Sequence, residues 1–370
     1  MSNNLNREIV LEALSNVIEP ELKKDIVALN FVSDLQVEGN TISLHVKSVN
    51  PALHARRRMQ EAVEFTLRRI LGKDVEVKCE VEGLNKDEQQ AHRKVLPGVK
   101  NIVAIASGKG GVGKSTVTAN LAAGLAKKGF KVGLIDADIY GPSVPLMFDC
   151  VHEKPKAVEI DGKQLIEPIE SYGVKLLSIG FFADINQAIV WRGPMATKAL
   201  NQMFKDVNWG ELDYLLIDLP PGTGDVHLTI VQVAPLTGAL IVTTPQEVAL
   251  ADARKGVAMF RLDSVQVPVL GIVENMSWFT PAELPENKYY IFGKDGAKGL
   301  AEQLNVKIIG QIPLVQSIRE AGDAGRPAVL QFGTPTAQAF EELTDAFVKQ
   351  VNWRNEHLPP TKLVETTYQH

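Results

Sequence analysis

The chain has 370 residues, of which 45% are hydrophobic, so its length predicts two domains and its composition permits a sizeable buried core. Its formal net charge of −5 argues against broad affinity for nucleic acid or for anionic membranes. It opens with no signal-peptide pattern, contains no apolar run that approaches a membrane span, and has only Cys79 and Cys150, so we expect a cytoplasmic protein without a disulfide framework.

Residues 1–83 have the pattern of a small α+β domain. Two stretches, "EIVLEALSNVI" and "ALHARRRMQEAVEFTLRRIL", have helical apolar spacing, while "VSDLQVEG" and "NTISLHVKSV" alternate like a hairpin that turns at Gly39-Asn40. A further alternating strand, "DVEVKCEVEG", follows. Residues 84–98 are charged, poor in apolar residues and closed by Pro97-Gly98, so we expect a linker there.

Residues 99–352 have a different sequence pattern, in which continuous apolar runs alternate with amphipathic helical stretches. These runs are "NIVAIAS", "KVGLID", "VKLLSIG", "YLLIDLP", "ALIVTTP", "VPVLGIVEN" and "VKIIGQIP". The pattern predicts an α/β domain with a doubly wound, mostly parallel sheet covered on both faces. Ligands of such sheets bind beyond the carboxyl ends of the strands. Residues 353–370 are polar and are expected to form a tail.

The segment "GKGGVGKS" fits the phosphate-loop pattern, and it follows a predicted strand and opens a predicted helix. Glycines let backbone N–H groups turn toward phosphate oxygens, and the helix N-terminus adds positive potential. Lys114 would neutralise the outer phosphates, and the Ser115 hydroxyl would reach Mg²⁺. The predicted nucleotide-binding residues of the loop are Gly108, Lys109, Gly110, Gly111, Val112, Gly113, Lys114, Ser115 and Thr116.

Lys109 is a second lysine, five residues before Lys114, inside the glycine run. A lysine this early in the loop would point away from its own phosphate site. It is better placed to reach a partner's nucleotide across a two-fold interface and to act there like an arginine finger. A solvated lysine with no catalytic role is the other interpretation of Lys109.

Aspartates end two of the apolar runs. Asp218, in "YLLIDLPPGTGD", resembles the carboxylate that holds the Mg²⁺ shell after an apolar strand. In "LIDADIYGPS", Asp138 could orient the attacking water, and Asp136 could hold a metal-bound water or Lys114. Buried strand-end carboxylates are costly without a cation, so idle acids are not expected here, although a structural lysine pair stays open for Asp136.

The two-lysine loop resembles that of the deviant Walker A ATPases. Together with "DADIYGPS", "WRGPM", "DYLLIDLPPGTGD", "TTPQEVALAD" and "GIVENMS", it closely resembles the Mrp/ApbC iron–sulfur cluster carriers over residues 95–330. The segment "EPELKKDIVALNFV" resembles the small domain that precedes the ATPase in many bacterial members. The resemblance implies an ATP- and Mg²⁺-dependent face-to-face homodimer that transfers iron–sulfur clusters to apoproteins.

That resemblance assigns roles to individual positions. Lys109 matches the signature lysine, Lys114 the phosphate-loop lysine and Ser115 the Mg²⁺ ligand. Asp138 matches the residue that positions water, and Asp218 matches the second-shell metal aspartate. Asn275, in "ENM", matches the residue that hydrogen-bonds adenine, a role that suits an amide because it both donates and accepts. A simple turn residue is the alternative for Asn275.

The chain departs from the family where cluster ligands are expected. Members usually carry a C-x-x-C pair after "ENMS", but residues 278–293, "WFTPAELPENKYYIFG", contain neither cysteine nor histidine. Glu283 and Glu286 have similar spacing, yet carboxylates are poor ligands for cluster iron, and a Pro-rich surface connection is the simpler interpretation. His54 stands near the turn where the small domain often has a cysteine. The iron–sulfur ligands are therefore unknown.

Three hypotheses follow from these observations. The first is an ATP-hydrolysing homodimer that carries iron–sulfur clusters between donor and acceptor proteins. The second is an ATP-switched scaffold that grips such partners without holding a cluster. The third is a positioning or partitioning ATPase, but the chain ends without a basic amphipathic helix for membranes, and its acidity gives no DNA-binding surface. We expect neither nucleic acid nor a membrane among its partners.

Overall fold

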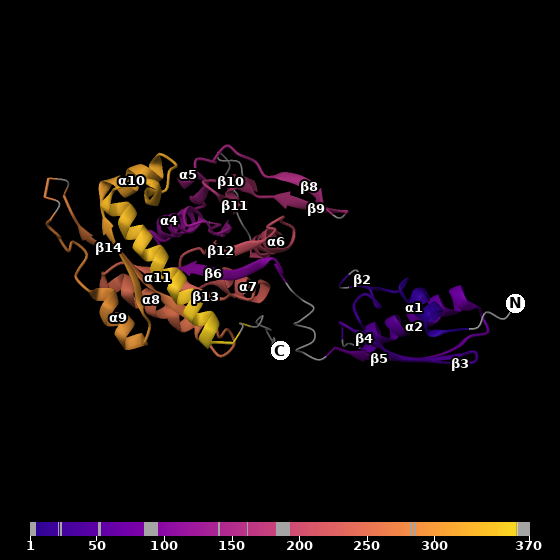
Figure 1. Cartoon of the computed structure of the whole chain (residues 1–370). Helices are drawn as coiled ribbons and strands as arrows, with labels where there is room; N and C mark the ends of the chain where they lie inside the picture. Colours follow the sequence, from indigo (N-terminus) through magenta and orange to yellow (C-terminus); the bar gives the residue numbers. More distant parts are fainter. Residues whose placement is uncertain are drawn as a thin grey trace. The chain divides into compact units, whose positions relative to one another are not determined.

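The structure is a computed structural model that describes residues 5–20, 22, 24–50, 53–84, 95–139, 141–160, 162–182, 193–281, 283–284, 286–359 and 361. It divides into two compact units, Met1–Lys94 and Val95–His370, and each is described by itself (Figure 1). Among the predicted features, most of the linker, the first two residues of "WRGPM" and most of the polar tail lie outside the described residues.

The first unit is a small α+β domain, as its sequence pattern predicts. Its sheet has the order β3-β4-β5, with the β3–β4 pair antiparallel around Gly39 and the β4–β5 pair parallel. Alternate residues of β4 are buried, and they form one core with apolar residues of the long helix α2. The elements are α1 (Arg7–Leu14), β1 (Ile18–Glu19), β2 (Lys24–Asp25), β3 (Val32–Glu38), β4 (Thr41–Ser48), α2 (Leu53–Leu71) and β5 (Glu76–Gly83).

The second unit is built on an eight-stranded sheet with the order β10-β11-β7-β12-β6-β13-β14-β15. All neighbouring strands are parallel except β10, which is antiparallel to β11. The doubly wound, mostly parallel sheet that the apolar runs predict is therefore confirmed. The strands are β6 (Val99–Ala106), β7 (Val132–Asp136), β10 (Ile169–Ser171), β11 (Val174–Ser178), β12 (Leu212–Asp218), β13 (Gly238–Thr243), β14 (Val269–Phe279) and β15 (Ile308–Leu314).

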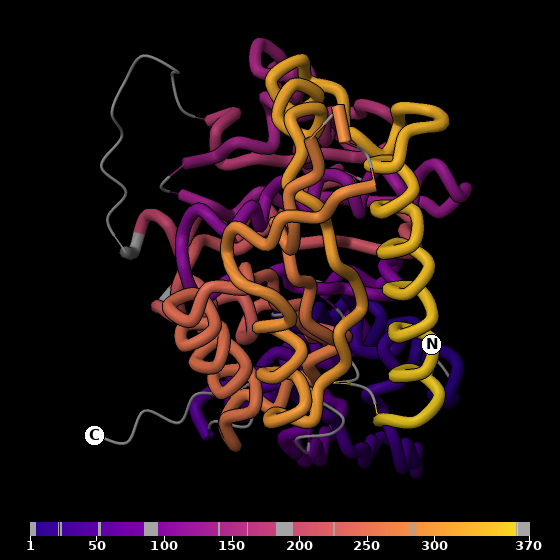
Figure 2. The backbone as a smooth tube through the Cα atoms, turned by 90° about the vertical axis from the view of Figure 1, so that its left-hand side faces the viewer, coloured from indigo at the N-terminus to yellow at the C-terminus, as the bar shows by residue number. Residues whose placement is uncertain are grey.

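Helices cover both faces of this sheet. Helix α11 packs with α4 against one face, while α8 packs with α9 on the other, and Figure 2 shows α11 and α8 on opposite sides. Because both faces are covered, the central strands are buried along their whole length, and that burial explains their unbroken apolar runs. The α-helices are α4 (Lys114–Lys127), α5 (Val144–Met147), α6 (Gly193–Lys205), α7 (Asp225–Val233), α8 (Glu247–Phe260), α9 (Gly296–Leu304), α10 (Gln316–Asp323) and α11 (Pro335–His357).

A strand pair at one edge of the sheet has no counterpart in the predicted elements. Strands β8 (Lys156–Ile160) and β9 (Lys163–Glu167) form an antiparallel hairpin ahead of β10. Their residues are mostly exposed or half-buried, so their sequence lacks the apolar run that marks the other strands. Two short 3₁₀ helices, Ile179–Phe182 and Ala328–Leu330, complete the unit.

The carboxyl terminus differs from the polar tail expected from residue 353. Helix α11 continues through His357, because Val351 and Arg354 are buried in its last turns. The Arg354 guanidinium also donates to the Pro359 carbonyl at 2.7 Å, which fixes the chain just beyond the helix. Within the described part of the chain, no helix has both the length and the apolar character needed to span a bilayer.

Candidate functional site

The phosphate loop lies at the carboxyl edge of the sheet, between the end of β6 and the start of α4. Gly111 and Gly113 have φ angles of +81° and +79°, a conformation that side chains rarely adopt. A Cβ at Gly113 would collide with the amide nitrogen of Asn275. The loop sequence therefore satisfies both the backbone conformation and the close approach of β14, and it leaves the N-terminus of α4 open for an anion.

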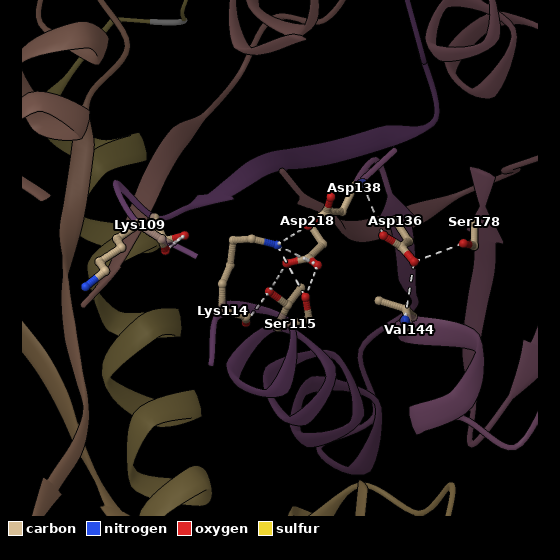
Figure 3. Close-up of polar contacts among 10 residues, drawn as sticks. Lys109, Lys114, Ser115, Asp136, Asp138, Val144, Ser178 and Asp218 are labelled. Atoms are coloured by element: carbon tan, nitrogen blue, oxygen red, sulfur yellow. Dashed lines mark hydrogen bonds and ion pairs between the residues drawn. The ribbon is translucent and has the colours of Figure 1, made fainter. Parts of the chain in front are cut away.

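Lys114 and Asp218 form a buried ion pair at the first turn of α4 (Figure 3). The lysine is 6% exposed and the aspartate 0%, and their charged atoms lie 2.8 Å apart. The Ser115 hydroxyl donates to one Asp218 oxygen at 2.6 Å, and the Thr118 hydroxyl lies 2.7 Å from the other. A buried carboxylate is stable only when it is compensated in this way. The structure thus brings Lys114, Ser115 and Asp218 together, as their positions in the sequence predict.

Asp136 lies directly beside Asp218, because the two residues are register partners on the parallel strands β7 and β12. It accepts hydrogen bonds from the Ser178 hydroxyl at 2.9 Å and from the backbone N–H groups of Asp138 and Val144. Burial, together with repulsion from Asp218, raises the pKa of Asp136 to about 7. Asp136 forms no close ion pair with Lys114 but stands behind Asp218, where an additional cation would favour its charged form.

Asp138 and Lys109 stand on either side of this cluster. The Asp138 carboxylate lies 3.9 Å from the Lys114 ammonium, at the rim of the buried group. Lys109 points away from the other labelled side chains in Figure 3, and it is exposed. The loop nevertheless holds its backbone, since the Ser107 hydroxyl donates to the Lys109 carbonyl at 3.0 Å. The lysine side chain thus extends from a fixed loop toward solvent rather than toward its own site.

Asn275 lines a mainly apolar hollow of about 260 Å³ beside the phosphate loop. Its amide nitrogen donates to the Val112 carbonyl at 2.8 Å, which joins β14 to the loop. Apolar walls with one amide suit a flat heteroaromatic base. The remaining lining residues come from the loop and α4, from α5, from β14 and from the segment 313–323; they are Gly113, Thr116, Leu146, Met147, Met276, Pro313, Leu314, Val315, Ile318, Arg319, Gly322 and Asp323.

Several of these residues are absent from the sequence-based site. Thr118 could have been found, since it lies one helical turn after Lys114 and so shares its face of α4. Ser178 is a polar residue at the end of an apolar strand, the same signal that marks Asp136. His227, buried in α7, has its pKa lowered to about 4 by burial and, to a smaller extent, by the Lys114 charge, which links it to the site; no sequence signal marks it. Residues 313–323 reach the site only through the sheet order, which their sequence does not reveal.

The charge balance of the site shows which ligands it can accept. The carboxylates of Asp218 and Asp138 lie 2.8 and 3.9 Å from the buried Lys114 ammonium, and Asp136 stands behind Asp218. Hydroxyl and carboxylate oxygens are the ligands that Mg²⁺ prefers, so the Ser115 hydroxyl and the Asp218 carboxylate fit a magnesium ion. A helix N-terminus, a buried lysine and a divalent cation together match the charge of a nucleoside triphosphate. The fold and the site therefore define a P-loop NTPase.

Comparisons with known proteins agree with this class. Residues 98–348 match the family described as NUBPL iron-transfer P-loop NTPase, and residues 7–79 match the family of iron-sulfur cluster assembly proteins. The iron-sulfur cluster carrier protein of Synechocystis is 43% identical over 94% of this chain and 97% of its own length. The iron-sulfur cluster transfer protein NUBPL of Dictyostelium discoideum is 45% identical over 73% of this chain and 82% of its own length.

A solved structure is also similar. The nucleotide-binding protein of Archaeoglobus fulgidus in complex with ADP superimposes with a TM-score of 0.56 at 39% identity, covering 66% of this chain and 93% of the other. The family match spans more than half of the chain, and the Synechocystis relative is alike over 94% of it. The chain belongs to the iron–sulfur cluster carrier family of P-loop NTPases, in agreement with the resemblance found in its motifs.

The two thiols of the chain belong to different units and are unsuited to bind iron. Cys79 belongs to the core of the first unit and Cys150 to the core of the second, and both are free and buried. Burial raises the pKa of each thiol to about 12, so both stay protonated near neutrality. In the described part of the chain, no group of three or more His, Cys, Asp or Glu residues is arranged to hold a metal ion. The sequence-based doubt about cluster ligands therefore stands.

Proposed function

We propose that this chain is an ATP-binding and ATP-hydrolysing homodimer that delivers iron–sulfur clusters to apoproteins. The observation that carries the proposal is the different placement of the two lysines of one loop. Lys114 is buried and paired with Asp218, whereas Lys109 is exposed and points away. A loop that holds one lysine inside its own site and another outside it supports a site completed by a second copy.

Nucleotide binding would use groups that already converge in the structure. The phosphates would lie on the N–H groups of residues 108–116 and on the Lys114 ammonium, and the base would enter the hollow beside Asn275. Ser115 and Asp218 would hold Mg²⁺, directly or through water, with Asp136 behind them. When bound, the ion supplies charge neutralisation to the phosphates. The Lys114–Asp218 pair must loosen for this arrangement to form.

Hydrolysis needs a positioned water molecule and a compensating charge. We assign the first role to Asp138, whose carboxylate lies at the rim of the site, 3.9 Å from the Lys114 ammonium. We assign the second role to Lys109 of the other copy, which would add positive charge as the outer phosphate departs. A lysine supplied by a partner makes hydrolysis depend on the encounter of two chains.

The dependence of hydrolysis on protein concentration tests this proposal. At saturating Mg-ATP, the rate per chain should rise with protein concentration and reach a plateau once the dimer is saturated. Sedimentation velocity under the same conditions should show the dimer appear over the same concentration range. A rate per chain that stays constant while the protein remains monomeric would contradict the dimeric site.

A second candidate function has a specific observation in its favour. Both thiols are buried and protonated, and residues 278–293 contain no thiol, so two copies do not offer four accessible thiolates for a cluster. On this alternative, the dimer is an ATP-switched scaffold that grips a cluster donor or acceptor without holding the cluster. Family membership favours the carrier, and the ligand chemistry favours the scaffold.

Anaerobic reconstitution separates these two functions. The purified protein is incubated with iron and sulfide, and bound iron and sulfide are measured per dimer, with a relative that has the C-x-x-C pair as control. The same samples are then offered to an apo-acceptor. A cluster that binds and transfers supports the carrier. Under conditions that load the control, a chain without bound cluster supports the scaffold.

The remaining assignments concern the partners of the protein and the compartment in which it acts. The net charge of −5 supports proteins rather than nucleic acid or anionic membranes as partners. Two buried free thiols are compatible with a reducing compartment, and we propose the cytoplasm. Stimulation of hydrolysis by DNA or by lipid vesicles would contradict the first assignment and would favour a positioning or partitioning ATPase.

A further inference from the structure

Helix α2 carries a positive charge in a chain that is acidic overall. It packs on β4 and β5 of the first unit (Figure 1), and it contains five arginines and two glutamates. Arg57 and Arg68 each form an ion pair with a glutamate four residues away, at 3.5 and 3.7 Å. Within the described part of the chain, neither Arg58 nor Arg69 has an acidic partner. The helix therefore holds positive charge that the described residues do not neutralise.

The two arginines without acidic partners belong to one exposed face of α2. His54, Arg58, Ala62, Phe65 and Arg69 recur every three or four residues, a spacing that places them in one row along the helix. All five are exposed, and Phe65 is 66% exposed. The Arg69 guanidinium lies 5.9 Å from the centre of the Phe65 ring, so the row joins positive charge to an aromatic surface. We call these five residues the α2 row.

A cavity of about 200 Å³ opens beside the amino-terminal half of the α2 row. Three residues of the row line it, namely His54, Arg58 and Ala62. Two apolar side chains add to its walls: Met59, which is buried, and Ile18, which is 53% exposed. Because most of the lining is apolar and the charged groups lie at its rim, the cavity suits one aliphatic side chain.

The cavity also has an acidic lining residue, Glu19, whose carboxylate is held by the chain itself. Glu19 is 1% exposed, and its Oε2 atom accepts a hydrogen bond from the Leu22 N–H group at 2.8 Å. Arg58 and His54, in contrast, are exposed. A molecule that approaches from solvent therefore meets the two basic side chains first, so the mouth of the cavity favours a negatively charged group beside the apolar one.

The separation of Arg58 and Arg69 indicates what kind of molecule fits the α2 row. They are eleven positions apart, about 16 Å along a helix, and about five residues of extended chain cover the same distance. An extended peptide can therefore place an acidic side chain on each arginine and an apolar side chain in the cavity. A nucleic-acid strand would supply the negative charge but no aliphatic side chain.

We propose that the α2 row and its cavity bind an extended acidic segment of another protein, with one aliphatic side chain of that segment in the cavity and acidic side chains on Arg58 and Arg69. This inference goes beyond the proposed function, which assigns no role to the first unit. It also holds whether or not the chain carries a cluster. The first unit captures a partner protein, while the nucleotide chemistry belongs to the second unit.

A synthetic peptide tests the inference on the full chain. The probe is a fluorescent peptide of about nine residues, with a central leucine flanked by aspartates and glutamates, and fluorescence anisotropy measures its binding in about 0.1 M salt. We expect Arg58→Glu to weaken binding at least about tenfold, because attraction at the cavity mouth becomes repulsion. Lys78→Glu is the control, since Lys78 alternates with the buried Val77 and Cys79 and so lies on the other face of the sheet. It should weaken binding less than about twofold.

Two further measurements separate lost binding from a folding defect. Arg58→Glu should gain affinity for a peptide in which lysines replace the acids, a reversal that a misfolded variant cannot show. Ala62→Trp narrows the cavity without changing the charge. It should weaken binding of the leucine peptide at least about fivefold but leave a peptide with serine in that position unaffected.

The inference is overturned if the unmodified chain does not bind the acidic peptide, or if Arg58→Glu and Lys78→Glu bind it equally well. It is also overturned if the leucine and serine peptides bind alike, because the cavity would then be unused. Tighter binding of a single-stranded oligonucleotide than of the peptide would assign the row to nucleic acid instead. Weaker dimerisation of Arg58→Glu, in a chain that does not bind the peptide, would assign it to a second copy.

Discussion

The phosphate loop and residues 278–293 follow strands at the same edge of one sheet, yet their side chains differ in burial and in charge. In the phosphate loop, Lys114 is buried and each oxygen of its partner Asp218 has a hydrogen-bond donor. In residues 278–293, Leu284, Tyr289, Tyr290 and Ile291 are exposed, and the sequence contains no cysteine. The comparison teaches that this chain keeps a phosphate site with compensated charges, while residues 278–293 lack the thiols that the family usually has there.

Lys114→Ala gives the largest expected effect, because it removes the buried cation of the phosphate loop. We expect hydrolysis to fall by at least about 10³-fold as phosphate charge loses its compensation. The variant should also lose about 3 kcal/mol of unfolding free energy, since Asp218 is left buried and unpaired. Steady-state phosphate release and denaturant unfolding measure the two effects.

Lys128→Ala is the matched control, because Lys128 ends the same helix and pairs with Asp345 at the surface. That pair is partly exposed, so its loss should cost less than about 1 kcal/mol and leave hydrolysis intact. If Lys114→Ala hydrolysed ATP at a rate within about tenfold of the unmodified chain, while folding normally, the assigned phosphate site would be wrong.

Thr118→Val should have an intermediate effect and shows how tightly the buried cluster is compensated. The Thr118 hydroxyl is 2.7 Å from Asp218, and valine keeps its shape but removes the hydrogen bond to a charged group. We expect a loss of about 2 kcal/mol in unfolding free energy and a severalfold slower hydrolysis. Thr344→Val, which removes a hydrogen bond to the neutral Phe340 carbonyl in α11, should cost only about 1 kcal/mol.

Equal losses from the two threonine variants, with hydrolysis unchanged in both, would show that Asp218 does not depend on the hydroxyl. The hydrogen bond between Thr118 and Asp218 would then contribute no more to stability than a bond to a neutral carbonyl. Chemical denaturation of both variants at one pH decides between these outcomes.

The smallest expected effect is a change in the pH dependence of the unfolding free energy when His227 is replaced. Burial lowers the pKa of His227 to about 4, below its usual 6.5, so the unfolded chain takes up a proton before the folded chain does. Its contribution to stability is therefore present above about pH 6.5 and is lost as the pH falls toward about 4. Between pH 7 and 5.5, His227→Gln should lose about 1 kcal/mol less unfolding free energy than the unmodified chain.

Asp136 acts in the opposite direction, since its pKa is raised to about 7 and its proton uptake favours the folded state as the pH falls. The comparison of His227→Gln with the unmodified chain is valid because both share that contribution. His152→Gln, at an exposed position, is the control and should leave the pH dependence unchanged. Parallel pH profiles for all three chains would refute the account of His227.

The sequence alone predicts much of the fold, because burial on both sides leaves a direct pattern. The unbroken apolar runs of β6, β7, β12 and β13 identify the parallel sheet, and the glycine spacing locates the phosphate loop. The hairpin of β8 and β9 escapes prediction because it is largely exposed and lacks such a run. The continuation of α11 through His357 is also missed, because burial of a single arginine there is not a sequence signal.

The sequence predicts which side chains meet in the site when those side chains belong to recognisable motifs. Lys114, Ser115 and Asp218 meet as expected, since strand ends and a helix start share one edge of a parallel sheet. The side-by-side placement of Asp136 and Asp218 follows only from strand register, which no local pattern gives. The order β13-β14-β15, likewise set by long-range packing, brings Asn275 and residues 313–323 to the phosphate loop.

A mixing experiment tests the central claim most directly, namely that Lys109 of one copy serves the nucleotide of the other. Lys109→Ala and Asp138→Asn should each be nearly inactive while still binding ATP. Mixed as monomers, they form heterodimers in which one site has its own Asp138 and the partner copy's Lys109. The account predicts recovery to about a quarter of the unmodified rate, because half of the dimers are mixed and each has one intact site. A mixture no more active than the two variants measured separately would contradict it.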